Sequence, residues 1–446
     1  MDVTRKVVSH LADSTSRPLT GTGPGPVAQS PPVTLPLRYM AVGLVCFLLF
    51  ACDLAWQVNR GVLFSPGAPA GVTLTHLLTL GGLMSFVMGA VYQLSTVAFL
   101  VPIASVRWAR VLFYAHVVGL VGFLASFAAW WPAGIVIFGA WMAAVLYGFC
   151  GNMMVSLLRA RDRGPMWRFV FFAHLHLALA LAAAVTLILG DANLWPAAQA
   201  EQMAILATHI LLAGGGFFGF LIFGFSYKLV PMFTLSHGYD TRYEQWAFWA
   251  SLFALYALVV WSWAPSLAIG LVSALGVVAA FLTHALAVRQ ILKRRVRRRV
   301  EAPIRGVLAA LALGVLWAMG FAWHVTSFRD AAIWRGLVPF ALLGFVSLTV
   351  VSLAYKIVPF LAWTRRFAGT KRTGSSVLIS HLLDVSSARF VIGGMALGAT
   401  GVGLGAPFGA AWLCEAGAWM VAASLGVFAF HMSSVFRRAA RKEGKV

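Results

Sequence analysis

Charged residues are scarce in this chain. Asp, Glu, Lys and Arg make up 11% of its 446 residues, hydrophobic residues make up 61%, and the mean hydropathy is +0.85. A water-soluble domain of this size needs far more charge on its surface, so a soluble globular protein is excluded. The apolar runs also lack the strict two-residue alternation of barrel strands, which excludes a membrane β-barrel.

Cysteine pairs and the common catalytic motifs are missing as well. The four cysteines form no Cys-x-x-Cys pair and lie in or beside apolar segments, where small buried residues are expected. There is no P-loop, no Rossmann glycine pattern after a strand and no hydrolase triad. No nucleotide-dependent or hydrolytic reaction is therefore assigned.

The chain instead contains twelve apolar segments, each suited to crossing a hydrocarbon layer of roughly 30 Å as a helix of about 20 residues. They lie near 39–57, 71–94, 107–129, 133–157, 168–190, 202–233, 244–263, 266–289, 304–325, 336–362, 388–407 and 411–436. The sequence thus predicts an all-α integral membrane protein with twelve transmembrane helices. The longest segments, the sixth and tenth, are expected to tilt or extend beyond the bilayer.

Positive charge is concentrated in alternate loops. The formal net charge is +21, and with an internal amino terminus the inner loops and tails carry 31 of the 34 Lys and Arg. Only Arg60, Arg329 and Arg335 fall on the outer side. The positive-inside rule therefore predicts a multi-pass protein of a bacterial cytoplasmic membrane with both termini cytoplasmic. The run 293–299 is interpreted as a topological anchor near anionic headgroups rather than a nucleic-acid site.

Domain boundaries follow from composition. Residues 1–35 are polar, are rich in Pro, Gly and Ser, and lack the apolar core of a signal peptide, so they are expected to form a disordered cytoplasmic tail. Residues 36–437 form one membrane domain, and 438–446 form a basic cytoplasmic tail. Lipid is the expected surrounding, and no nucleic-acid partner is expected.

The membrane domain carries one series of markers three times. These are Arg38, Arg168 and Arg305 near the starts of the first, fifth and ninth segments, and Tyr92, Tyr227 and Tyr355 near the ends of the second, sixth and tenth. Such self-similarity predicts three quasi-repeated four-helix arcs, at approximately 36–160, 165–292 and 302–437.

Two of the repeat tyrosines begin a Tyr-Lys-(Leu/Ile)-Val-Pro motif, at 227–231 and 355–359. The motif is predicted to be architectural: Pro would end the helix, Lys would extend to the inner surface and Tyr would anchor at the interface. His284 and His431, near the inner ends of the eighth and twelfth segments, are expected to contact headgroups or carbonyls.

Three histidines are predicted at outer depth: His76 begins the second segment, His209 lies in the sixth and His324 ends the ninth. Imidazole is the usual ligand of haem iron and of copper, so these three are candidate cofactor ligands, with His76 and His209 also candidate metal ligands. Glycines follow at 81–82 and 214–216. They would let a neighbouring helix or a flat macrocycle approach the backbone. The alternative is that the histidines are only hydrogen-bonded bundle residues.

His174 and His176, in the fifth segment, are candidates for a further haem or metal site. Residues at i and i+2 of a helix face directions about 200° apart, so the two should meet different neighbours. Asp53 and Glu415 are the notable acidic residues within the spans. Pairing with His76 or Arg335 and a role in proton transfer both remain open for them.

This combination resembles the haem-copper oxidase subunit I superfamily, in which twelve helices form three arcs. The phrases Thr-His-Leu-Leu-Thr-Leu-Gly at 75–81 and Gly-Phe-Ser-Tyr-Lys-Leu-Val-Pro-Met-Phe at 224–233 are also similar to bacterial membrane proteins placed beside that superfamily and the NnrS family. NnrS proteins are twelve-helix haem- and copper-containing proteins linked to nitric oxide stress. The resemblance implies that His76 ligates a low-spin haem and that His209 ligates copper.

The sequence departs from the oxidase pattern in two places. The tenth segment (335–363) lacks the His-x-His pair for two haems, and the seventh (244–263) lacks the His-His pair of the metal centre. A complete binuclear centre is therefore not expected, and no enzymatic reaction is assigned. One haem could remain, held by His76 with His324 or His209.

Two functional hypotheses follow. The first is a divergent haem-copper-oxidase-like protein that binds haem, copper or both through intramembrane histidines. It would act in respiratory electron transport or nitric oxide handling, with an electron-transfer or respiratory-complex partner. The second is a non-haem transporter or permease, or a metal or cofactor assembly factor, on the same scaffold.

Overall fold

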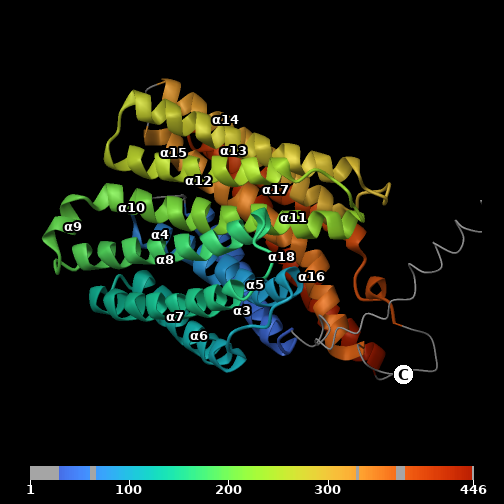
Figure 1. Ribbon diagram of the computed structural model, residues 1–446. Helices are drawn as coiled ribbons and strands as arrows, with labels where there is room; N and C mark the ends of the chain where they lie inside the picture. The colour runs from blue at the N-terminus through green and yellow to red at the C-terminus, as the bar shows by residue number, and fades with distance from the viewer. Residues whose placement is uncertain (1–29, 61–66, 328–330, 368–376, 444–446) are drawn as a thin grey trace, which may run out of the picture.

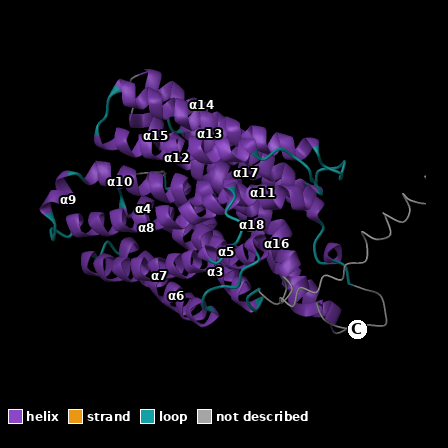
Figure 2. Cartoon of the chain, viewed as in Figure 1, coloured by secondary structure: helices purple, strands orange, loops and turns teal. Residues whose placement is uncertain are grey.

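The computed structural model describes residues 30–60, 67–327, 331–367 and 377–443. The predicted tail up to residue 29 and Arg329 lie outside these ranges. The described chain is helical, and its β-structure is limited to one isolated antiparallel bridge between Ser236 and Arg295 (Figure 2). Twelve helices are long and apolar enough to cross a membrane, and they coincide with the twelve predicted segments. The all-α membrane fold is confirmed.

Nine of these spans run as regular α-helices within the described residues. They are α3 (Thr34–Asn59), α6 (Val106–Ala128), α7 (Pro132–Leu158), α8 (Pro165–Asp191), α12 (Arg242–Trp263), α13 (Leu267–Lys293), α14 (Ala302–Ser327), α17 (Ala388–Gly405) and α18 (Ala411–Glu443). Short helices α9 (Pro196–Ala200), η4 (Ile379–His381) and η5 (Val385–Ser387) lie in the connections. Since α18 extends to Glu443, the twelfth helix continues into the predicted basic tail.

The second, sixth and tenth spans share a different construction, in which a π-helical stretch separates two α-helices. The second is α4 (Pro69–His76), η1 (Leu77–Met84) and α5 (Ser85–Phe99); the sixth is α10 (Gln202–Ile210), η2 (Leu211–Gly219) and α11 (Phe220–Thr234); the tenth is α15 (Ala331–Phe340), η3 (Ala341–Ser347) and α16 (Leu348–Phe367). Each π-segment begins 14 to 16 residues before a repeat tyrosine. π-Helices are rare and occur frequently at functional sites.

Packing follows the chain order and then closes on itself. Within the bundle α6 packs on α7, α12 on α13 and α17 on α18, while α7 meets α8, α13 meets α14, and α18 returns to α3 (Figure 1). The π-containing spans also touch one another, η2 against η3 and α16 against α5. In the most apolar stretch of each span, 72% of residues are buried in the second and 61% in the tenth, against 39% in the sixth and 33% in the third. Two of the three interrupted helices therefore contribute much of the interior.

Local sequence explains several helix starts. The Ser105 hydroxyl accepts a hydrogen bond from the Trp108 amide (3.1 Å), and Ser266 does the same for Ile269 (3.3 Å). Both are N-caps, which satisfy amides that have no partner within the helix. Pro132 and Pro165 occupy first-turn positions of α7 and α8, where proline costs no helical hydrogen bond.

One local prediction was wrong. Pro231 and Pro359 do not end their helices, because α11 continues to Thr234 and α16 to Phe367. Proline is tolerated within membrane helices because neighbouring helices and local adjustments satisfy the freed backbone groups. In α11, Pro231 has no amide to donate to the Tyr227 carbonyl, and the Tyr239 hydroxyl donates to that carbonyl instead (3.5 Å).

Candidate functional site

His76 and His209 end two helices that both lead into π-segments. His76 is the last residue of α4, and His209 is the penultimate residue of α10. Both are partly buried. The two residues that the sequence singles out as metal ligands thus occupy matching positions in the second and sixth spans, just before the π-helical stretch.

Each of these imidazoles is oriented through one nitrogen. His76 Nδ1 lies 2.9 Å from the Val72 carbonyl, and His209 Nδ1 lies 3.0 Å from the Ala180 carbonyl of α8. A carbonyl oxygen can only accept, so the neutral ring carries its proton on Nδ1. The lone pair is then on Nε2, the arrangement that second-shell carbonyls impose on metal-ligating histidines.

Aromatic rings hold His76 in place. Its imidazole stacks on Phe127 at 5.3 Å with an interplanar angle of 6°, and it meets the edge of Phe123 at 5.4 Å. Both phenylalanines belong to α6. The stack fixes the plane of the imidazole while leaving its edge nitrogens available, so His76 is oriented by side-chain packing as well as by its hydrogen bond.

The fifth span provides two fully buried histidines that meet different neighbours, as their spacing predicts. His174 donates Nδ1–H to the Val170 carbonyl (2.7 Å), packs against Phe149 and Phe217, and leaves Nε2 without a hydrogen-bond partner among the described residues. His176 lies between the Gly216 carbonyl (3.2 Å) and the Tyr256 hydroxyl (3.3 Å). His174 therefore retains ligand capacity, whereas both nitrogens of His176 are engaged.

His324 belongs to another part of the bundle. It is buried near the end of α14, where its ring meets Trp334 edge-on at 5.3 Å. Helices α13, α15, α16 and α17 and the π-segment η3 pack on α14. His76, by contrast, packs on Phe123 and Phe127 of α6.

The glycines that follow the two histidines are used for helix packing. A Cβ on Gly82 would lie 2.9 Å from the Phe47 ring of α3, and one on Gly216 would lie 2.7 Å from His176 Cβ of α8. Gly214, in contrast, has open space beside it. Of the two uses considered from the sequence, close approach of a neighbouring helix accounts for Gly82 and Gly216.

The repeat tyrosines occupy positions other than those predicted. Tyr227 and Tyr355 are buried, and their hydroxyls lie 2.8 Å from His284 Nδ1 and His431 Nδ1 respectively. Interfacial anchoring is therefore wrong for both tyrosines, and headgroup contact is wrong for the buried His284; for the half-buried His431 headgroup contact stays a prediction. The pairing of helix six with eight and of ten with twelve depends on tertiary contacts that motif spacing does not reveal.

Beyond the C-terminal end of the sixth span, Tyr239 extends this polar cluster. Its hydroxyl donates to the Tyr227 carbonyl (3.5 Å). Burial raises the pKa of Tyr239 to about 12, and the negative charge of Glu244 adds to the shift. Tyr239 is therefore a neutral hydrogen-bond donor at any physiological pH.

Two further polar groups complete the description. His116, which sequence reasoning did not single out as a ligand, is fully buried in α6 and bonds through Nε2 to the Ser85 hydroxyl (2.7 Å). Asp53 accepts a hydrogen bond from Gln57 one helical turn away (3.2 Å). Gln57, rather than His76 or Arg335, thus makes this hydrogen bond with Asp53.

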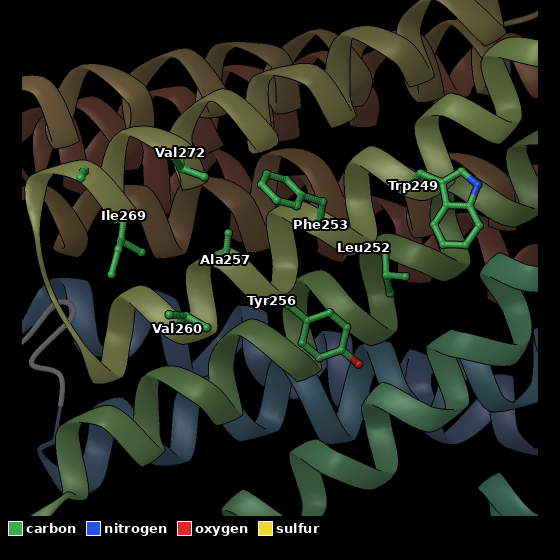
Figure 3. Close-up of a pocket in the computed structure, with 9 residues that line it drawn as sticks. Trp249, Leu252, Phe253, Tyr256, Ala257, Val260, Ile269 and Val272 are labelled. Carbon is green, nitrogen blue, oxygen red and sulfur yellow. The ribbon is translucent and has the colours of Figure 1, made fainter.

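An apolar groove of about 650 Å³ lies between α12 and α13 (Figure 3). Trp249, Phe253, Val260 and Val272 are among the residues that line it. Tyr256 also borders the groove but extends away from Phe253 and Val272, with its hydroxyl on His176. No histidine, cysteine or acid is among its lining residues, so the groove presents hydrocarbon rather than ligands.

The described residues contain no group of three or more His, Cys, Asp or Glu side chains placed to hold one metal ion. The His76–His209 pair therefore offers two imidazoles. Two nitrogen ligands can serve a haem iron axially or a copper ion with further non-protein ligands. The donor chemistry fits either group, whereas a closed all-protein cage is not formed. No protein-family model matches the chain, and no curated protein matches it significantly.

Proposed function

We propose that this protein binds haem, copper or both in the cytoplasmic membrane, and that it acts in respiratory redox chemistry or nitric oxide handling. The observation that carries the proposal is the shared setting of His76 and His209, each of which lies just before a π-segment. Each donates Nδ1–H to a backbone carbonyl and so has its Nε2 lone pair available. His76 and His209 would hold the group.

The surroundings suit a redox cofactor. Two phenylalanines of α6 pack on His76, and His209 bonds to the Ala180 carbonyl of α8; apolar neighbours of this kind lower the local dielectric constant. A bound haem or copper ion would supply one-electron chemistry. The chain itself orients the imidazoles, selects their tautomer and sets the polarity around them.

The helix order supports placing the chain beside the haem-copper oxidase superfamily as a divergent relative. Three contacts between successive groups of four spans, α7 with α8, α13 with α14 and α18 with α3, are what three quasi-repeated arcs would produce. The three π-segments recur in the second span of each group. The charge distribution supports cytoplasmic termini.

An absorption spectrum with metal analysis tests this function. The full-length protein, purified in detergent from cells supplied with haem and copper, should show a Soret band with sharp reduced α-bands, or stoichiometric copper. The signal should be lost in His76→Ala and His209→Ala. A colourless, copper-free wild-type protein would overturn the proposal.

A permease is the second candidate, and the π-segments favour it. η1, η2 and η3 interrupt three spans, of which the second and the sixth both contact the tenth. Transporters frequently bind substrate where membrane helices lose regular geometry. A permease predicts a colourless protein whose thermal unfolding shifts with substrate. The same purified sample therefore separates the two functions.

A further inference from the structure

The loop between α13 and α14 concentrates positive charge at one end of the bundle. Six of the seven residues from Lys293 to Arg299 are Lys or Arg, and all seven side chains are exposed. The loop begins where the membrane span α13 ends, on the same side of the bundle as the C-terminal end of α18 (Figure 1). It therefore lies at the level where lipid headgroups meet the protein.

Backbone contacts give this loop a defined conformation. The Arg297 amide donates to the Thr234 carbonyl (3.2 Å), and Arg295 forms an antiparallel bridge with Ser236. The Thr234 and Ser236 hydroxyls are themselves hydrogen-bonded to each other at 2.7 Å. The loop is thus attached to the end of α11, which holds its arginines in fixed positions.

The nearby carboxylate does not neutralise most of this charge. Glu301 forms ion pairs with Arg297 and with Lys356 of α16. Arg294, Arg298 and Arg299 have no carboxylate partner in the part of the chain that the structure describes. Like charges that lie close together repel one another. A multivalent anion that contacts several guanidinium groups together would relieve this repulsion and so stabilise the loop.

Two other basic loops on this side contain their own acids. Arg242 pairs with Asp240 at 2.7 Å, and these hydrogen bonds lower the pKa of Asp240, which keeps the carboxylate charged. In the loop 159–164, Asp162 lies between Arg161 and Arg163. The 293–299 loop lacks an acid within its run, so its unneutralised charge distinguishes it.

We propose that the 293–299 loop is a binding site for the phosphates of anionic phospholipids, with Arg294, Arg298 and Arg299 as the phosphate ligands. Arginine suits this role because its planar guanidinium can donate two hydrogen bonds to one phosphate. Lipid is the favoured source because the loop lies directly beyond two membrane spans. Nucleic acid would require the same arginines to turn away from the bilayer.

The test compares two triple variants of the full-length, detergent-purified protein. R294Q/R298Q/R299Q removes the proposed ligands, whereas R159Q/R161Q/R163Q removes the same charge from another loop on the same side. Binding of short-chain phosphatidylglycerol and phosphatidylcholine would be measured by native mass spectrometry. A basic residue near an anionic surface contributes about fivefold in affinity, so the first variant should bind phosphatidylglycerol up to about a hundredfold more weakly. The second variant should remain within a few-fold of wild type.

Wild-type protein supplies readouts that need no variant. It should prefer phosphatidylglycerol to phosphatidylcholine at least tenfold, and the preference should decline as salt screens the charges. Equal affinity for the two lipids, or equal losses in both variants, would overturn the proposal. So would displacement of phosphatidylglycerol by a single-stranded oligonucleotide at a lower concentration than by free phosphatidylglycerol.

Discussion

The second and sixth spans differ from the tenth at the same structural position. All three widen into a π-helix, but a histidine stands at the entrance only in the first two: His76 before η1 and His209 before η2. The tenth span has Phe340 immediately before η3. The π geometry therefore does not depend on a histidine. The ligand residues are local additions to a helix construction that all three spans share.

The C-terminal halves of these spans divide differently. There the sixth and tenth spans agree, with Tyr227 bonded to His284 and Tyr355 to His431. The second span has the buried Tyr92, whose neighbour Asn152 is bonded to the Ser105 backbone. The N-terminal and C-terminal halves thus group the three spans differently, which separates candidate ligand positions from positions that bind helices together.

The largest expected effect is the loss of bound cofactor when His76 or His209 is removed. His76→Ala and His209→Ala should each lower bound haem or copper more than tenfold, because each removes one of two imidazole ligands. Absorbance and metal content per protein measure the loss. His431→Ala is the matched control, because it removes a histidine of the twelfth span that bonds to Tyr355, and it should retain the cofactor. Equal losses in all three would indicate a general folding defect and contradict the assignment.

Alanine substitutions at Gly216 and Gly214 should change the stability of the protein by different amounts, although both glycines lie in the sixth span. Gly216→Ala would place Cβ 2.7 Å from His176 Cβ, whereas Gly214→Ala meets open space. Overpacking of this kind destabilises by about 1–3 kcal/mol. The unfolding midpoint in detergent should fall for Gly216→Ala and stay near wild type for Gly214→Ala. A larger fall of the unfolding midpoint for Gly214→Ala than for Gly216→Ala would contradict this packing of η2.

Substitution of the three repeat tyrosines should show that a tyrosine hydrogen bond stabilises the sixth and tenth spans but not the second. Tyr227→Phe and Tyr355→Phe each deprive a histidine nitrogen of its partner, which should cost about 1–2 kcal/mol. The Tyr92 hydroxyl makes no hydrogen bond of ordinary geometry to the described residues, so Tyr92→Phe should change stability by less than about 0.5 kcal/mol. Thermal unfolding of the three variants under one condition compares them directly.

The smallest effect concerns the lysines of the two Tyr-Lys motifs. Lys356 pairs with Glu301 and lies 5.2 Å from the Phe233 ring centroid, whereas Lys228 has no ion pair among the described residues. A double-mutant cycle on Lys356→Met and Glu301→Gln should give a coupling of up to about 1 kcal/mol. Coupling of Lys228→Met with Glu301→Gln should be indistinguishable from zero. Equal coupling energies to Glu301 for Lys356 and Lys228 would contradict the expected difference between the tenth and sixth spans.

Sequence reasoning was most successful where one physical requirement dominates. Twelve apolar segments were located because crossing hydrocarbon demands long apolar helices, and the spacing of His174 and His176 predicted separate neighbours. It failed where partners come from distant segments. Pro231 was expected to end a helix, and Tyr227 was expected at the interface, yet both are enclosed by neighbouring spans.

The sequence by itself determined that this protein is helical, that it has twelve spans and where its charge lies, because hydropathy and helix length act locally along the chain. Only the tertiary structure decided what each histidine meets. His76 stacks on Phe127 of α6 and His209 bonds to the Ala180 carbonyl of α8, while His324 packs on Trp334. The relative rotation of helices depends on side-chain packing across the bundle, and no spacing within one helix encodes it.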